Sequence, residues 1–361
     1  MSLKEIYGTE LLRELCLAYG PSGEEREVAS VILKCTEGCY DERISDGMHS
    51  VILKISARKK GSAPLGIKRL LLSSHMDEVG FIVNEITDEG YLRFLILSGS
   101  DTRAWKGRNV TVGKPGRTVK GYVGAKPIHL IKRDERDTST PPEELYVDIG
   151  AKSREEAEKY VSVGDLGTYD SDFVRFGSEM RMIKAKAIDD RLGCSVMCDL
   201  VRDVWKMKDE LSFDIFFAFT CKEELGLSGA ACAAYKVDPD HALVFEATCA
   251  ADIDGVPPHR QVTVQGKGGA LSIMDRSTVY DGEFTEFLKK TAEEKKIPVQ
   301  YKQYVSGGND AGSIRKVRAG VKCAAVSAPV RYIHSPSCVL RESDMFAIKE
   351  LALSAITELC K

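Results

Sequence analysis

The sequence predicts an α/β protein in which helices sandwich a mainly parallel central sheet, with a small β-rich domain inserted. Short continuous apolar runs, typical of strands buried on both faces, alternate with helical patterns along most of the chain. Between residues 80 and 182 this rhythm changes to short alternating runs punctuated by glycine and proline. We therefore expect residues 1–79 and 183–361 to form one α/β domain and residues 80–182 to form the insertion.

The segment before the insertion contains two predicted helices and two predicted strands. Gly20-Pro-Ser-Gly23 separates the helices, and we expect the hydroxyl of Ser22 to cap the second of them. The second strand is an apolar run that leads directly to His75. The helices are expected at residues 10–19 and 24–37, and the strands at 51–56 and 68–74.

The insertion and the segment after it differ in their periodicity. Runs such as Gly90-Tyr-Leu-Arg-Phe-Leu-Ile96 alternate with a period of two, which predicts short half-buried strands in the insertion. After residue 184 helical and apolar segments alternate again, which favours parallel strands joined by helices. We expect helices at residues 190–205, 228–235, 283–295 and 344–359, and strands at 213–220, 242–246, 299–304 and 321–327.

The composition is that of an ordinary globular protein. The 361 residues are 43% hydrophobic and carry a net charge of -3, which argues against nucleic acid or an anionic membrane surface as a partner. No apolar stretch approaches the roughly 18 to 20 residues that a membrane-spanning helix needs. The eleven cysteines are scattered without a Cys-x-x-Cys pair, so reduced core thiols are expected rather than a zinc ribbon. These features predict a soluble cytoplasmic protein.

Several histidines and carboxylates share one position relative to the predicted strands. Each lies just after an apolar strand or at the start of the helix that follows one, so the same edge of the sheet would gather them. The doublet Glu223 and Glu224 is the most informative pair, because it comes just past the end of a long apolar run that reads as a buried strand. The full set is His75, Asp77, Asp189, Glu223, Glu224, Glu246 and His334.

This inventory fits two metal ions. Two imidazoles with three or more carboxylates and no cysteine suit zinc, cobalt or manganese. A pair of ions roughly 3.5 to 4 Å apart needs one bridging carboxylate, and each ion then takes one histidine and one further carboxylate. Such a set leaves Asp77 to orient His75 and Glu223 to act as a general base.

Six motifs that occur in order make the chain similar to the tetrahedral aminopeptidases, a cytosolic dinuclear-metal family that includes glutamyl and deblocking aminopeptidases. The resemblance extends from about residue 10 to the C-terminus and also covers the insertion. The motifs are Pro21-Ser-Gly-Glu-Glu25, Ser74-His-Met-Asp-Glu-Val-Gly-Phe81, Lys186-Ala-Ile-Asp-Asp-Arg-Leu-Gly193, Cys221-Lys-Glu-Glu-Leu-Gly-Leu-Ser-Gly-Ala230, Gly307-Gly-Asn-Asp-Ala-Gly312 and Arg331-Tyr-Ile-His-Ser-Pro336.

The resemblance implies a zinc-exopeptidase-like fold and a role for each site residue. Asp189 would bridge two divalent ions, zinc or cobalt, with manganese a further candidate. His75 and Glu246 would bind one ion, and Glu224 and His334 the other. The expected activity is removal of N-terminal residues from short peptides.

The resemblance also implies an assembly and a division of labour between the two parts of the chain. Residues 1–79 and 183–361 would form the catalytic domain. Residues 80–182 would mediate dimerisation, and the dimers would assemble into a homododecameric tetrahedral shell.

Departures from the family pattern keep other readings open. Glu246 stands where aspartate is usual and is more typical of dinuclear carboxypeptidases and deacylases, which therefore remain alternatives. A glycoside hydrolase or a metal-binding protein without turnover are further alternatives. His49 replaces a residue of the usual Asp-x-x-Gly-Asn pattern and could approach the site, and Asn309 stands where threonine is common. The candidate substrate-binding residues are Asp310, Gly308, Lys267 and Arg276.

Overall fold

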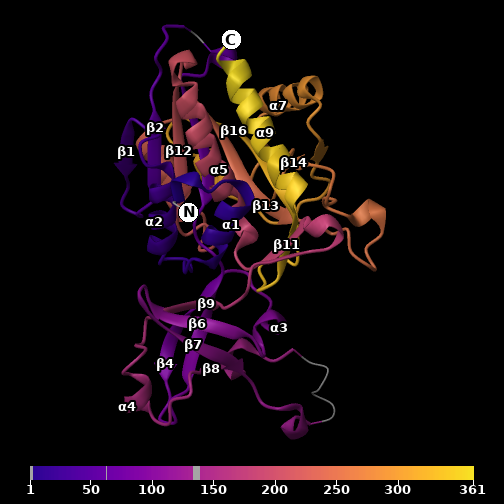
Figure 1. Ribbon diagram of the computed structural model, residues 1–361. Helices are drawn as coiled ribbons and strands as arrows, with labels where there is room; N and C mark the ends of the chain where they lie inside the picture. The colour runs from indigo at the N-terminus through magenta and orange to yellow at the C-terminus, as the bar shows by residue number, and fades with distance from the viewer. Residues whose placement is uncertain (1–2, 62, 133–138) are drawn as a thin grey trace.

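A computed structural model describes residues 3–61, 63–132 and 139–361. Within these ranges the strands form an 11-stranded sheet and a closed six-stranded barrel. Figure 1 shows the barrel below the larger sheet, which is covered by helices. The α/β fold predicted from the alternation of helices and strands is confirmed.

The larger sheet has a parallel centre and antiparallel edges. The four central strands β12, β3, β13 and β16 run parallel to one another, whereas β2 joins β12 and β17 joins β16 in antiparallel fashion. Across the sheet the strands are β1 (Glu42–Ser45), β2 (Val51–Ile55), β12 (Asp214–Thr220), β3 (Arg69–His75), β13 (His241–Cys249), β16 (Lys322–Arg331), β17 (Cys338–Arg341), β11 (Met182–Ala185) and β10 (Val174–Phe176). In addition, β14 (Gly269–Leu271) pairs with β16, and β15 (Val299–Tyr301) pairs with β14.

Helices cover both faces of this sheet because its central strands are apolar on both sides. Phe245 of β13 faces one helical layer, and its neighbour Val244 faces the other. The first layer contains α1 (Gly8–Leu17), α2 (Arg26–Thr36), α5 (Ile188–Lys206), α7 (Gly282–Lys295) and α9 (Glu342–Leu359), and the second contains α6 (Ser228–Val237) and α8 (Ala311–Ile314). No helix in the described ranges is both long and apolar enough to cross a membrane.

The barrel is built around aromatic side chains. The indole of Trp105 stacks on the ring of Tyr169 with 4.0 Å between centroids, and Phe81 packs edge-on against the same indole. At Gly167 a Cβ atom would lie 2.1 Å from the ring of Phe81, so only glycine leaves room for that ring. The strands are β4 (Gly80–Ile86), β5 (Leu92–Leu97), β6 (Asn109–Lys114), β7 (Arg117–Gly124), β8 (Tyr146–Asp148) and β9 (Leu166–Tyr169), with the short helices α3 (Thr102–Trp105) and α4 (Arg154–Ala157) nearby.

One glycine of α6 fixes the chain that follows β12. The N–H of Gly229 donates to the carbonyl of Cys221 over 3.0 Å. A Cβ atom at Gly229 would lie 2.3 Å from that carbonyl oxygen and 2.6 Å from the amide nitrogen of Cys221. Because backbone atoms cannot move aside as a flexible side chain can, this position tolerates only glycine.

We predict that Gly229→Ala lowers the free energy of unfolding by about 1–3 kcal/mol, the usual cost of overpacking a core. Gly282→Ala is the matched control, because a Cβ atom there meets nothing within 4 Å. The control should leave stability unchanged or raise it by up to about 1 kcal/mol, since alanine favours a helix over glycine. Urea unfolding measures both variants, and equal stabilities would contradict the close approach at Gly229.

Candidate metal centre

The predicted site residues meet at the carboxyl ends of the parallel strands. His75 is the last residue of β3, and the Glu223–Glu224 doublet begins three residues after the end of β12. Glu246 lies within β13, which continues for three residues beyond it to Cys249. The side chains meet because parallel strands end at the same edge of a sheet.

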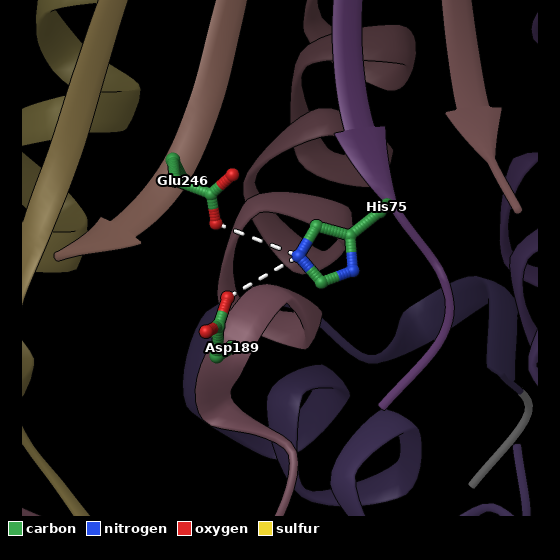
Figure 2. A group of neighbouring side chains, drawn as sticks. All are labelled: His75, Asp189 and Glu246. Carbon is green, nitrogen blue, oxygen red and sulfur yellow. Dashed lines mark hydrogen bonds and ion pairs between the residues drawn. The ribbon is translucent and has the colours of Figure 1, made fainter. Parts of the chain in front are cut away.

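The first group of side chains is His75, Asp189 and Glu246. The Nε2 atom of His75 lies 3.2 Å from Oδ1 of Asp189 and 3.5 Å from Oε1 of Glu246. Figure 2 shows both carboxylates directed at the same ring nitrogen. All three side chains are buried. Three ligand atoms therefore converge on one point within the protein.

The second group is Asp189, Glu224 and His334. The Nε2 atom of His334 lies 3.3 Å from Oδ2 of Asp189 and 3.3 Å from Oε1 of Glu224. Asp189 thus belongs to both groups and directs one carboxylate oxygen to each histidine. In each group the potential ligand atoms lie within 4.8 Å of one another. This sharing is the arrangement that a bridging carboxylate requires.

The donor set of the two groups fits a pair of divalent cations. Nitrogen and carboxylate oxygen are suitable ligands for zinc and related metals. Oε1 of Glu224 is buried and accepts no hydrogen bond from the residues that the structure describes. A buried carboxylate oxygen without a donor is unfavourable, and a cation between the groups would satisfy it.

The electrostatics of the two groups shift the pKa values of the ligands, so that cation binding depends on pH. Burial by itself lowers the pKa of both imidazoles, but the neighbouring carboxylates outweigh it and hold the pKa of His75 and His334 above the ordinary range. Burial raises the pKa of Glu224 to about 7. A cation that takes these ligands must displace their protons, so its affinity rises with pH.

Asp77 holds the backbone of the glutamate doublet. Its two carboxylate oxygens accept the N–H groups of Glu223 and Glu224 over 3.0 and 3.1 Å. Its main-chain carbonyl lies 3.0 Å from Nδ1 of His75, which orients the imidazole. Ser22 donates its hydroxyl to Asp77 as well. The predicted capping role of Ser22 is wrong, because α2 starts after Glu25 without a side-chain cap and the Ser22 hydroxyl is used by Asp77.

Glu223 lies beside both groups but belongs to neither. Its backbone is fixed by Asp77, and no hydrogen bond to its carboxylate is described within the ranges that the structure covers. Burial raises the pKa of Glu223, and the nearby charges of Asp310 and Glu224 raise it further. A carboxylate whose pKa moves toward neutrality is suited to accept and release a proton.

Two candidate substrate-binding residues lie near the end of β12. Asp310 is only 1% exposed, and its carboxylate accepts the hydroxyl of Thr220 over 2.7 Å. Gly308 is exposed on the preceding loop, where a Cβ atom would meet the hydroxyl of Ser277 at 3.0 Å. The structure therefore places a buried carboxylate and an exposed glycine in the same short segment, and their contact with substrate stays a prediction.

Two other candidates lie in separate surroundings. Lys267 is exposed on a turn whose backbone is held by Asp344, which accepts the N–H groups of the glycines on either side. His49 is exposed and lines a groove of about 870 Å³ beside α2. Neither residue belongs to the two groups of ligand atoms found in the described part of the chain.

Sequence reasoning missed a buried ionic network that connects the ligand-bearing segments. The carboxylate of Glu78 lies 2.6 Å from the ammonium of Lys186 and 3.3 Å from the guanidinium of Arg191. Arg191 also donates to the carbonyl of Met76 over 2.6 Å. The network ties the loop after His75 to the start of α5. The sequence did contain a signal for this network, because Glu78, Lys186 and Arg191 each lie within three residues of a predicted metal ligand.

Comparison with known sequences identifies relatives over nearly the whole chain. The family described as M42 glutamyl aminopeptidase matches residues 54–351. A protein of Acetivibrio thermocellus is 33% identical over 96% of this chain and 98% of its own length. The lysyl aminopeptidase of Pyrococcus furiosus is 28% identical over 97% of both chains. The glutamyl aminopeptidase of Lactococcus lactis is 27% identical over 87% of this chain and 86% of its own.

Solved structures show the same fold. The TET aminopeptidase of a marine sediment Thaumarchaeota archaeon is similar with a TM-score of 0.90 and 37% identity, over 96% of this chain and 95% of its own. The TET1 peptidase of Pyrococcus horikoshii can assemble into a tetrahedron or a large octahedral shell. It is similar with a TM-score of 0.82 and 29% identity, over 96% of this chain and 98% of its own. A Thermotoga maritima protein named as an endoglucanase is similar with a TM-score of 0.76 and 30% identity, over 97% of this chain and 98% of its own.

Proposed function

The chain belongs to the M42 glutamyl aminopeptidase family and is an aminopeptidase, and from this premise we propose how its residues divide the work. Enzymes of this family depend on two metal ions. In our proposal His75, Asp189 and Glu246 hold one ion, zinc or cobalt. Glu224 and His334 hold the second together with the other oxygen of Asp189. The observation that carries this assignment is the carboxylate of Asp189, which directs one oxygen to each histidine.

Two such ions, when bound, supply Lewis acidity that makes water more acidic and polarises a peptide carbonyl. The proton transfers are then the task of Glu223. Its carboxylate accepts a proton from the water that attacks the peptide carbonyl carbon, and it returns that proton to the leaving amine. Asp77 fixes the positions of Glu223 and Glu224, because its carboxylate accepts the N–H groups of both residues.

We also propose the assembly that the resemblance implies. Residues 80–182 would serve as the dimerisation domain, and dimers would assemble into a tetrahedral dodecamer that admits short peptides. Two observations support this assembly. The TET1 relative can assemble into a tetrahedron or a large octahedral shell. On the barrel, the apolar residues Leu95 and Tyr122 are 57% and 62% exposed to solvent. Eleven free thiols are typical of a reducing compartment, which supports a cytoplasmic location.

The test of the proposed function is a panel of substrates and metal states. We expect aminoacyl-anilides to be cleaved by zinc-loaded or cobalt-loaded protein and not by metal-stripped protein. N-acylated peptides with a free C-terminus test the carboxypeptidase and deacylase alternatives, and a cellulose oligosaccharide tests the glycosidase alternative. No cleavage of any anilide in any metal state would contradict the proposal.

A further inference from the structure

Glu25 holds the backbone of the loop that carries the glutamate doublet. One oxygen of its buried carboxylate, Oε1, accepts the N–H of Lys222 over 3.2 Å and the N–H of Gly23 over 2.8 Å. Lys222 is 197 residues farther along the chain and directly precedes Glu223. The contact therefore ties the loop after β12 to the start of α2.

The backbone conformation of Lys222 requires such a contact. Its φ angle is +57°, in the left-handed region that is unfavourable for a residue with a side chain. Such a conformation persists only where the surrounding structure fixes it. Because Glu223 is the next residue, a rotation of the backbone at Lys222 would redirect the carboxylate of the proposed base.

The other backbone groups of this loop have separate partners. Asp77 accepts the N–H groups of the glutamate doublet, and the N–H groups of Ser228 and Gly229 at the start of α6 donate to the carbonyls of the two residues before the doublet. Three successive N–H groups, those of residues 222–224, are thus held by two carboxylates from distant segments. A change at Glu25 removes one of these supports and leaves the contacts of Asp77 in place.

We infer that Glu25 is a positioning residue for the reaction, which holds the backbone beside Glu223 so that the carboxylate of Glu223 reaches the attacking water. The inference rests on the proposed function, because it takes Glu223 as the base. Glu25 belongs to neither group of ligand atoms in the described part of the chain, and it acts through a backbone N–H. The required property is therefore an acceptor oxygen at this position rather than a negative charge.

The test compares two substitutions of similar length in the zinc-loaded or cobalt-loaded enzyme. Glu25→Met removes the acceptor oxygen, and we expect kcat for a cleaved anilide to fall about 10- to 100-fold, the usual effect of losing an outer support or of a 1 Å misplacement. Glu25→Gln keeps an acceptor oxygen and should stay within a few fold of the wild type. Glu24→Met is the matched control, because it removes the same charge one residue away, where the carboxylate pairs with the exposed Arg26. It should leave kcat unchanged.

A second comparison separates positioning of the base from a general effect on folding. In the Glu223→Gln background the base is already lost, so Glu25→Met should lower the residual kcat no further, as is typical of residues that act as a unit. A purely structural role would lower kcat by the same factor in both backgrounds. That result, or a loss in Glu25→Gln as large as that in Glu25→Met, overturns the role of Glu25.

Hydrogen exchange of the wild-type protein decides the question even where a variant does not fold. The N–H of Lys222 should exchange slowly, because it donates to a buried carboxylate. Unprotected exchange of this N–H would overturn the inference. Full activity of Glu223→Gln, or no cleavage of any anilide by wild-type protein, contradicts the proposed function instead.

Discussion

Glu223→Gln is expected to lower kcat about 10²- to 10⁴-fold, the range that general acid–base catalysis contributes. Glutamine has nearly the same shape but cannot take a proton from water at neutral pH. Because Glu223 lies outside both groups of ligand atoms, the variant should keep its full metal content. Steady-state kinetics and metal analysis of the same preparation measure the two properties together.

Glu210→Gln is the matched control for this substitution. Glu210 is exposed and precedes the start of β12, so the same chemical change is made at the opposite end of that strand from the ligand groups. Its activity and metal content should equal those of the wild type. Loss of metal in Glu223→Gln would show that the roles of Glu223 and Glu224 are exchanged.

Asp189→Asn is expected to disrupt both metal positions at once. Asparagine offers one neutral oxygen where Asp189 directs an anionic oxygen to each histidine. We expect the affinity for metal to fall by more than the roughly 10- to 100-fold that is typical of losing an outer partner of a ligand. Activity should be lost at metal concentrations that saturate the wild type. Isothermal titration with zinc measures affinity and stoichiometry.

Asp203→Asn provides the comparison on the same helix. Asp203 pairs with Lys206 and Lys349, both over 2.9 Å, and lies far along α5 from its start. Its loss should leave two ions bound. Retention of two tightly bound ions by Asp189→Asn would remove the basis for the shared carboxylate.

The sequence predicted the long elements well because their patterns are local. The apolar run of β12 and the helical pattern of α5 each occupy one continuous segment, and the structure confirms both. The short edge strands were not predicted. β1 is four residues long and largely exposed, so it has no apolar pattern, and its pairing with β2 is what makes it a strand.

The candidate ligands were predictable because each lies beside a strong local signal. His75 and the glutamate doublet follow apolar strands, and this position alone indicates one edge of a parallel sheet. The partners of these residues were not predictable in the same way. Ser22 reads locally as a helix cap, yet its hydroxyl bonds to Asp77, 55 residues farther along the chain.

The sequence by itself determined which residues are chemically able to hold two ions and to move a proton, because residue types and their place after apolar strands are local properties. Only the tertiary structure decided how these residues combine. The two oxygens of Asp189 face histidines that are 259 residues apart in the sequence, and Asp77 fixes both glutamates from the loop that follows β3. Long-range pairing of strands sets these distances, and no local pattern contains them.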